Sequence, residues 1–182
     1  MPYNNPGMQP TGEHKPIQEI LQEMDSVMLW QKKFNNKAMK MCQASGFNGF
    51  KRLHRFLAKK FMCWHLELEN EAFDRFQIVL ESDVDDFKYS AGDLPDHLKT
   101  WAGYLETGME KLAWLTNEYR MITGLGNCVA EAALCKMAKN YEKACRWHKR
   151  FKMTNSMHDM YDFDAQLHEK YRKKEARDQN YN

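Results

Sequence analysis

The sequence predicts an all-α protein, an antiparallel four-helix bundle followed by a short fifth helix at the C-terminus. Three observations support this prediction. Four long stretches repeat apolar residues at three- and four-residue steps, the spacing of one face of an α-helix. No stretch alternates apolar and polar residues with period two, the pattern of a half-buried strand. The 182 residues include only nine glycines and five prolines, and turn-rich β-sandwiches and barrels use more of both.

The first two helices are predicted from two long apolar stripes. The first stripe runs from Ile17 to Met41 and indicates a helix of about 28 residues. The glycines of ASGFNG, residues 44–49, end it. The second stripe runs from Phe50 to Val79 and indicates a helix of roughly 33 residues, about 50 Å long.

The third and fourth helices follow a polar, acidic segment, SDVDDFKYSAGD. Asp93 is the expected N-cap of the third helix, with Pro95 in its first turn, where a missing N–H does no harm. The third stripe extends from Leu94 to Ile122 and stops at the turn TGLGN, and the fourth extends from Val129 to Phe151. A weaker pattern predicts a fifth helix over about residues 157–175.

The chain divides into three predicted parts. Residues 1–16 hold four of the five prolines and are expected to form an extended or disordered arm. Residues 17–153 form the bundle, and residues 154–182 form the C-terminal helix and a basic tail. The chain is long enough for a single domain with a substantial core.

The charge balance argues against a protein that binds nucleic acid through its overall charge. The 27 basic and 25 acidic side chains give a net charge of +2, too small to attract the whole molecule to nucleic acid. Contact with nucleic acid would come from local patches, KRLHRFLAKK, KACRWHKRFK and EKYRKKEAR. Such stretches bind phosphates in some proteins and are ordinary solvated helix faces in others, and both interpretations stay open.

Cysteine usage and the N-terminus indicate a cytoplasmic protein, or one packaged in a particle assembled in a cytoplasm. The five cysteines are odd in number and contain no C-x-x-C, which favours reduced, buried thiols. The first residues have neither the basic nor the apolar region of a secretory signal. No stretch approaches the ~18 consecutive apolar residues of a membrane span, so no membrane contact is expected.

Three segments resemble the ferritin-like superfamily: GFNGFKRLHRF, DHLKTWAGYLETGMEKL and NYEKACRWHKRF. The pattern is most similar to the Dps-type mini-ferritins, whose second helix often begins with a glycine, aromatics and then Leu-His-x-x-Phe. The matching positions here are Gly46, Phe47, Phe50, Leu53 and His54. One difference is that Phe56 follows the histidine at two residues instead of three.

The resemblance implies a homo-oligomeric cage that oxidises ferrous iron at carboxylates and histidines, stores the ferric mineral and, in some members, shields DNA. It also implies a long crossover between the second and third helices. The predicted loop of about 12 residues spans at most ~40 Å and barely reaches across the bundle. A plain up-down-up-down bundle is therefore equally admissible.

A di-iron centre inside the bundle is not expected. Such centres take inward carboxylates from all four helices and Glu-x-x-His from two of them, and this sequence contains no Glu-x-x-His. On helical wheels, the later glutamates lie roughly 120–180° from their apolar stripes. These are Glu106, Glu110, Glu131 and Glu142.

The candidate iron ligands come instead from the second helix, where residues 61–71 read FMCWHLELENE. His54, His65 and Glu69 share one face, and His65 and Glu69 are spaced i, i+4, so they can bind one cation or each other. Glu67 and Glu71 lie on the other flank and are weaker candidates. Because the first helix contains no histidine, a partner chain is expected to complete the ligand set. The alternative is that these are boundary residues, hydrogen-bonded or solvated.

Two functions are therefore carried forward. The first is a ferritin-like or Dps-like self-assembling bundle that binds or stores iron. The second is a non-enzymatic structural or interaction protein, such as a component of a phage particle or another large assembly. The sequence contains no phosphate-binding glycine loop, nucleophile elbow or H-E-x-x-H motif that would indicate another enzyme class.

Overall fold

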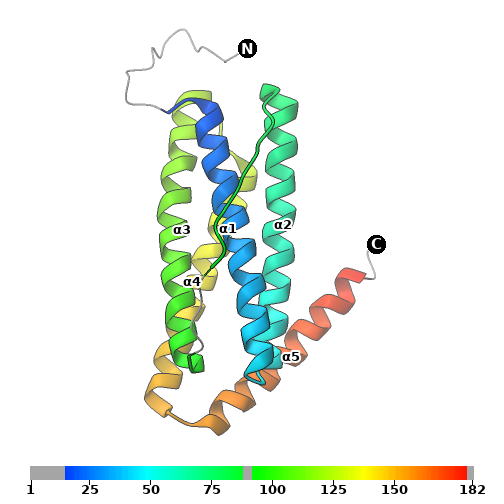
Figure 1. Cartoon of the computed structure of the whole chain (residues 1–182), viewed down its shortest axis with the longest axis vertical. Helices are drawn as coiled ribbons and strands as arrows, with labels where there is room; N and C mark the ends of the chain where they lie inside the picture. Colours follow the sequence, from blue (N-terminus) through cyan, green and yellow to red (C-terminus); the bar gives the residue numbers. More distant parts are fainter. Residues whose placement is uncertain (1–14, 88–91, 180–182) are drawn as a thin grey trace.

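The computed structural model describes residues 15–87 and 92–179, and these residues form five helices without a strand. The helices are α1 (Ile17–Ala44), α2 (Asn48–Phe76), α3 (Leu94–Thr123), α4 (Cys128–Thr154) and α5 (Met157–Gln179). The first four form the bundle, and α5 leaves its lower end and projects outward (Figure 1). The predicted all-α class is confirmed. The predicted arm, residues 1–16, lies outside the described part except for Lys15 and Pro16.

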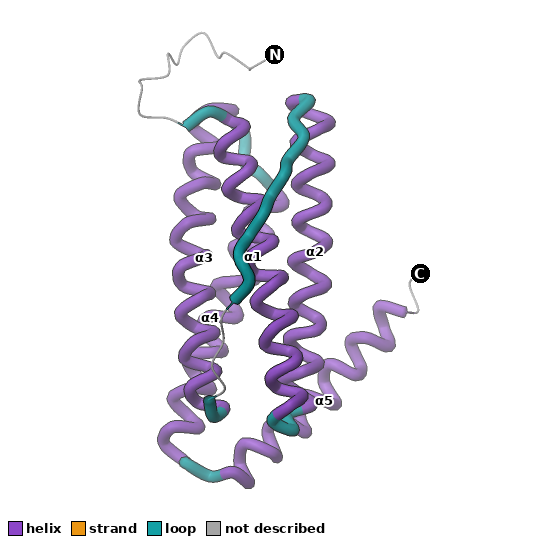
Figure 2. Tube along the Cα trace, in the orientation of Figure 1, coloured by secondary structure: helices purple, strands orange, loops and turns teal. Residues whose placement is uncertain are grey.

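The bundle has a long crossover between α2 and α3. Residues 77–87 leave the top of α2 and run diagonally over α1, and α3 begins at the opposite end (Figures 1 and 2). As a result α3 runs parallel to α2, and the up-down-up-down alternative is wrong. Helix α2 ends at Phe76 instead of continuing past Val79, which is exposed. The shorter helix leaves about 17 residues for the connection, enough for at most ~60 Å.

Local geometry explains why α2 ends where it does. Gln77 adopts the left-handed conformation, with φ 57° and ψ 32°, and the N–H of Ile78 donates to the carbonyl of Ala72 (3.2 Å). The N–H of Gln77 itself donates to the Phe73 carbonyl (2.9 Å), and a left-handed residue with this 5→1 bond is a common helix C-terminal motif. Beyond it, Leu80 is buried and the Phe87 ring stacks on Trp30 at 5.5 Å. The crossover is therefore packed against α1 over much of its length.

The turn between α1 and α2 uses its two glycines differently. Gly46 has φ +80° and ends α1 as predicted, with the N–H of Phe47 donating to the Cys42 carbonyl (2.8 Å). Gly49 lies in the first turn of α2, where a Cβ would sit 1.9 Å from the backbone carbonyl oxygen of Asp164. The Asp164 carboxylate accepts from the N–H groups of Gly49 (3.0 Å) and Phe50 (2.9 Å). A residue of α5 therefore caps α2.

The starts of α3 and α4 are capped by the residue directly before each helix, unlike the start of α2. The Asp93 side chain accepts from the N–H of Asp96 (3.0 Å), with Pro95 in the first turn, so both predicted features are confirmed. Asn127 caps α4 by accepting from the N–H of Ala130 (2.9 Å). These local caps satisfy N–H groups that have no partner within the helix.

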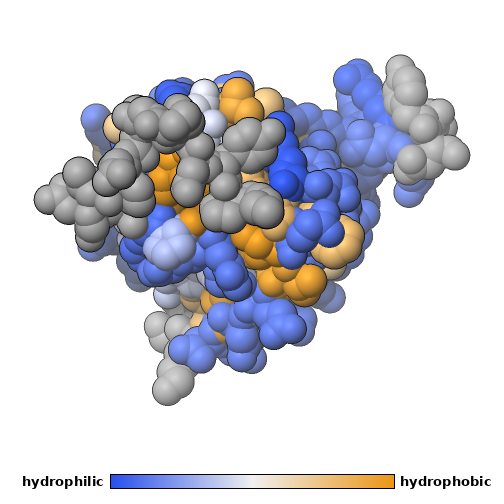
Figure 3. Space-filling model, turned by 90° about the horizontal axis from the view of Figure 1, so that it is seen from above, coloured by the Kyte–Doolittle hydropathy of each residue, from blue (hydrophilic) through white to orange (hydrophobic). Residues whose placement is uncertain are grey.

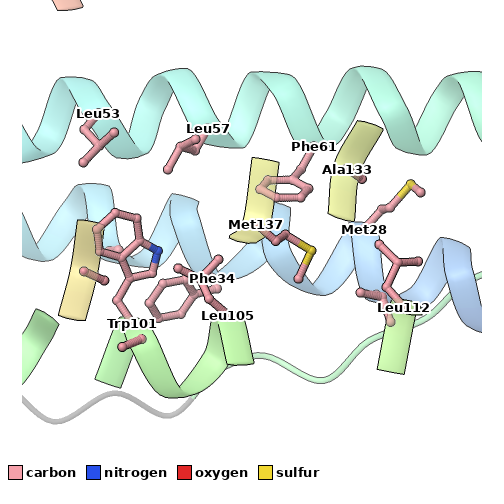
Figure 4. Packing of buried hydrophobic residues seen from close by; sticks show 14 of the residues in the cluster. Met28, Phe34, Leu53, Leu57, Phe61, Trp101, Leu105, Leu112, Ala133 and Met137 are labelled. Carbon is pink, nitrogen blue, oxygen red and sulfur yellow. The ribbon is translucent and has the colours of Figure 1, made fainter. Parts of the chain in front are cut away.

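The space between the four helices is filled by apolar side chains. Figure 4 shows Met28, Phe61 and Met137 among the side chains that fill this space. From above, most of the visible described surface is hydrophilic, including the outward part of α5 (Figure 3). None of the helices in the described residues is both long and apolar enough to cross a membrane.

The close approach at Gly49 predicts a strong size limit at this position. Gly49→Ala should lower the free energy of unfolding by about 1–3 kcal/mol, because the added methyl group forces α5 away from α2. Urea unfolding followed by circular dichroism measures the change. Gly103→Ala is the matched control, since Gly103 lies on an exposed face of α3 with no atom within 4 Å of the new methyl group. It should stabilise the protein by up to about 1 kcal/mol, and equal effects of the two changes would contradict the packing explanation.

Candidate metal-binding sites

The centre of the bundle offers no carboxylate cage among the described residues. At Gly108, a Cβ would lie 2.5 Å from the Met137 methyl group and 2.9 Å from the Gln31 amide nitrogen, so the helices approach closely there. Glu106, Glu110 and Glu142 are exposed, and Glu131 is partly exposed and pairs with Arg120 (2.6 Å). The predicted outward orientation of these four glutamates agrees with the structure.

Two other groups of metal-ligand side chains occur in the described residues. The first consists of Asp25, His65 and Glu69, whose ligand atoms lie within 4.8 Å of one another. His65 Nδ1 lies 2.6 Å from Asp25 Oδ1, and His65 Nε2 lies 3.4 Å from Glu69 Oε1. Because a carboxylate oxygen accepts, the Nδ1–H of His65 donates to Asp25. In a neutral ring the Nε2 lone pair then faces Glu69.

The crossover covers this Asp25–His65–Glu69 cluster. The Ser82 hydroxyl donates to Asp25 Oδ2 (2.5 Å), and Gln22 donates to Ser82 (2.7 Å). Asp25 is fully buried, and this burial raises the pKa of its carboxyl group, although the contacts with Ser82 and His65 act in the opposite direction. Glu69 keeps about a third of its side chain exposed (33%). The cluster therefore has a buried inner end and a solvent-facing outer end.

Asp25 was not predicted as a site residue. The sequence predicts that a neighbouring chain approaches His65 and Glu69, whereas the structure brings Asp25 of the same chain to His65. The sequence feature that could have indicated Asp25 is its position in the apolar stripe. Asp25 lies four residues after Leu21 and three before Met28, within the buried stripe of α1. A lone charge at such a position usually has a specific partner.

The second group contains Cys42, His54 and His97, from α1, α2 and α3, and all three are buried. His54 Nε2 lies 3.2 Å from His97 Nε2, and Cys42 Sγ lies 3.8 Å from the same His97 nitrogen. His54 and His65 are eleven positions apart, about 16 Å along a helix. The predicted ligands His54 and His65 therefore belong to separate clusters and cannot bind the same ion.

Burial controls protonation in the Cys42–His54–His97 cluster. It lowers the pKa of His97 to about 4 and holds the pKa of His54 well below its usual value, with a further effect from neighbouring His97. It also raises the pKa of the Cys42 thiol to about 12. At neutral pH the metal-free cluster is uncharged.

The remaining two predicted ligands lie elsewhere. Glu67 is exposed. Glu71 Oε1 accepts from Arg75 (3.2 Å), the Tyr119 hydroxyl (3.3 Å) and the Asn127 amide (3.4 Å), a network that connects α2 to α3 and to the start of α4. Neither glutamate belongs to either cluster.

The expectation of buried cysteines is correct for Cys42 alone. Cys145 is partly buried, and the other three thiols are exposed: Cys63, Cys128 and Cys135. Their helical positions fall outside the contacts between helices, although the surrounding sequence is apolar.

Two of the three basic stretches, residues 51–60 and 169–177, meet at one surface together with Lys136, which precedes the third stretch. Ammonium groups of Lys60, Lys136 and Lys174 lie 5.8, 5.4 and 5.1 Å from the centre of the Phe56 ring. Burial, reinforced by neighbouring lysines, lowers the pKa of Lys136 to about 8. This lysine cluster, formed by α2, α4 and α5, concentrates positive charge that is spread out along the sequence.

Comparison with known proteins gives a structural likeness only. No family model and no curated protein matches the sequence. The fold is similar to that of a solved humanized archaeal ferritin, with a TM-score of 0.70 over 83% of this chain and 94% of that chain. Sequence identity is 9%, so the likeness shows the fold. The chain has the fold of a ferritin-like helical bundle, which is the fold that the sequence resemblance implied.

The depressed pKa values of His54 and His97 predict loss of stability in mild acid. Between about pH 4 and pH 6.5 the unfolded His97 binds a proton that the folded form does not, so stability rises with pH across this window. In the metal-free protein, the protonation of His97 alone should lower the free energy of unfolding by up to about 1.4 kcal/mol for each unit by which the pH falls within this window. Urea unfolding across this range measures the slope. His97→Gln should flatten it, whereas His158→Gln, at a side chain 89% exposed, should leave it unchanged.

Proposed function

We propose that this ferritin-like bundle self-associates and binds ferrous iron at the Asp25–His65–Glu69 cluster. The observation that carries the proposal is that a buried carboxylate orients a histidine whose other nitrogen faces a second carboxylate. Carboxylate oxygen and imidazole nitrogen are ligands that iron accepts. The ferritin-like fold is consistent with this use.

The hydrogen bonding assigns different roles to the two carboxylates. Histidines that bind metals almost always donate their other ring N–H to a carboxylate, carbonyl or water, which fixes the ring. Asp25 makes that contact, so the ion is held by His65 Nε2 and Glu69. With a neutral ring and no ion, the Nε2 lone pair of His65 and a carboxylate oxygen of Glu69 face each other across 3.4 Å.

The proposed site is open on its outer side. Two protein ligands leave most coordination positions to water or to groups from a second copy of the chain. This is the physical reason for joining iron binding to self-association. A Dps-type cage, with sites shared between subunits, is the form of assembly that the proposal favours.

Ferrous binding under anaerobic conditions tests the site. His65→Ala and Glu69→Ala should each weaken binding at least tenfold, and Asp25→Asn should weaken it about 10- to 100-fold by releasing the His65 ring. Equilibrium dialysis measures the affinity, light scattering the assembly, and aerobic loading the oxidation rate. Glu67→Ala, which removes an exposed carboxylate two residues from both ligands, is the control and should bind normally.

Two outcomes would remove the iron proposal. One is a wild-type protein that takes up no more iron than the Glu69→Ala variant. The other is a monomer that oxidises iron no faster than buffer. Either result would favour the structural or interaction protein.

A second function, binding of nucleic acid, is favoured by the lysine cluster. Replacing Lys60, Lys136 and Lys174 by glutamine should weaken binding to a short DNA duplex and flatten the salt dependence of log K by up to about 2.7 units. Replacing Lys37, Lys40 and Lys99 removes the same charge from other elements and is the control. Fluorescence anisotropy at several salt concentrations measures both. Equal losses in the two triple variants would indicate a general charge effect and reject a specific site.

A further inference from the structure

The Cys42–His54–His97 cluster contains ligand types different from those of the proposed iron site. It offers a thiol and two imidazoles, contributed by three helices, and contains no carboxylate. Thiolate and imidazole together suit zinc and cuprous copper, whereas iron in ferritin-like bundles is held mainly by carboxylates. We propose that Cys42, His54 and His97 form a binding site for one thiophilic cation, Cu⁺ or Zn²⁺.

The distances between the donor atoms fit one ion. Two imidazole nitrogens bound to zinc at ~2.0–2.1 Å with tetrahedral angles are about 3.3 Å apart, and a thiolate sulfur is about 3.6 Å from each nitrogen. The structure has 3.2 Å between the two Nε2 atoms and 3.8 Å between Cys42 Sγ and His97 Nε2. All three donors lie within 4.8 Å of one another, so side-chain shifts of about an ångström would bring them to a shared ion.

His54 is oriented for this role by a neighbour on α1. The amide nitrogen of Asn35 donates to the Gln31 carbonyl (2.7 Å), which turns Asn35 Oδ1 toward His54 Nδ1 at 2.8 Å. An amide oxygen only accepts, so Nδ1 of His54 carries the hydrogen and Nε2 presents its lone pair. Trp101 packs against the same ring, with the ring centres 4.9 Å apart. The nitrogen that faces His97 is therefore fixed as a donor for a cation.

A pocket of about 240 Å³ gives the cluster a route to solvent. It lies where the end of α1, the start of α3 and the start of α5 meet, and both Cys42 and His97 line it. Three thioethers also line it, those of Met41, Met157 and Met160. Thioether sulfur is a soft ligand that favours cuprous copper. The lining therefore provides an access route suited to the proposed ion.

Binding of the ion to this cluster releases one proton. In the metal-free form, His97 Nε2 donates its hydrogen to the lone pair of His54 Nε2. To bind the ion, His97 shifts to its other tautomer and keeps its proton count, while Cys42 loses its thiol proton. The imidazoles are already neutral at pH 7, so one proton is released to solvent for each ion bound.

The experiment uses a chain whose only cysteine is Cys42, made by replacing Cys63, Cys128, Cys135 and Cys145 with serine. Co²⁺ serves as the probe for Zn²⁺, because a thiolate bound to Co²⁺ gives a charge-transfer band and a tetrahedral site gives intense visible bands. Cu⁺ is tested separately by competition with a colorimetric cuprous chelator. We expect one equivalent of ion, one proton released in unbuffered titration and a raised Tm in the Cys42-only protein.

Three variants of the Cys42-only protein complete the test. Cys42→Ser should abolish the thiolate band and the rise in Tm, and His97→Gln should weaken binding at least tenfold. His65→Ala should leave both intact, since His65 belongs to the other cluster. Circular dichroism of the metal-free variants confirms that each is folded, and Cys42→Ser preserves the size of the side chain if His97→Gln does not fold.

The outcomes separate the two metal proposals. A thiolate band that needs Cys42 and survives His65→Ala supports this site, whatever the result with ferrous iron. A Cys42-only protein with no band and no retention of Cu⁺ against the chelator overturns it, as does a band that persists after Cys42→Ser. Retention of Cu⁺ without a cobalt band identifies the ion as cuprous copper.

Discussion

The path of the chain between α2 and α3 determines what the rest of the bundle can bring together. Because this connection crosses the whole length of the molecule, α3 begins beside the end of α1, and His97 in its first turn meets Cys42 and His54. The same segment places Ser82 on the Asp25 carboxylate. If α3 began at the other end, His97 would lie tens of ångströms from Cys42. Both polar clusters therefore depend on one connection.

The interior has an apolar middle and a smaller set of buried polar groups, most of which have hydrogen-bond partners. Burying a polar group is costly unless it is hydrogen-bonded, and Asp25, Asn35 and His54 each have a well-placed partner. At Gly108 the helices approach so closely that even an added Cβ would collide with Met137 and Gln31. The two groups of metal-ligand side chains in the described residues are Asp25, His65 and Glu69, and Cys42, His54 and His97.

The helices could be predicted from the sequence because an apolar stripe and a cap are local properties. The end of α2 could not, since the apolar stripe continues to Val79 although the chain has left the helix at Gln77. The candidate sites were harder to predict than the end of α2. His65 with Glu69 is visible as an i, i+4 pair, but Asp25 and His97 are found only when the register between helices is known. That register is set by tertiary packing, and the apolar pattern of one helix gives no information about how it is aligned with another.

The carboxylate of Asp164 holds the first amides of α2, although more than a hundred positions separate them in the chain. During synthesis on a ribosome, α2 emerges long before its cap does. Its first turn must remain frayed or hydrated until Asp164, the eighth of the 23 residues of α5, has been translated. The completed bundle is therefore a late product of translation, and a nascent chain that stops before α5 exposes the end at which Cys42, His54 and His97 meet.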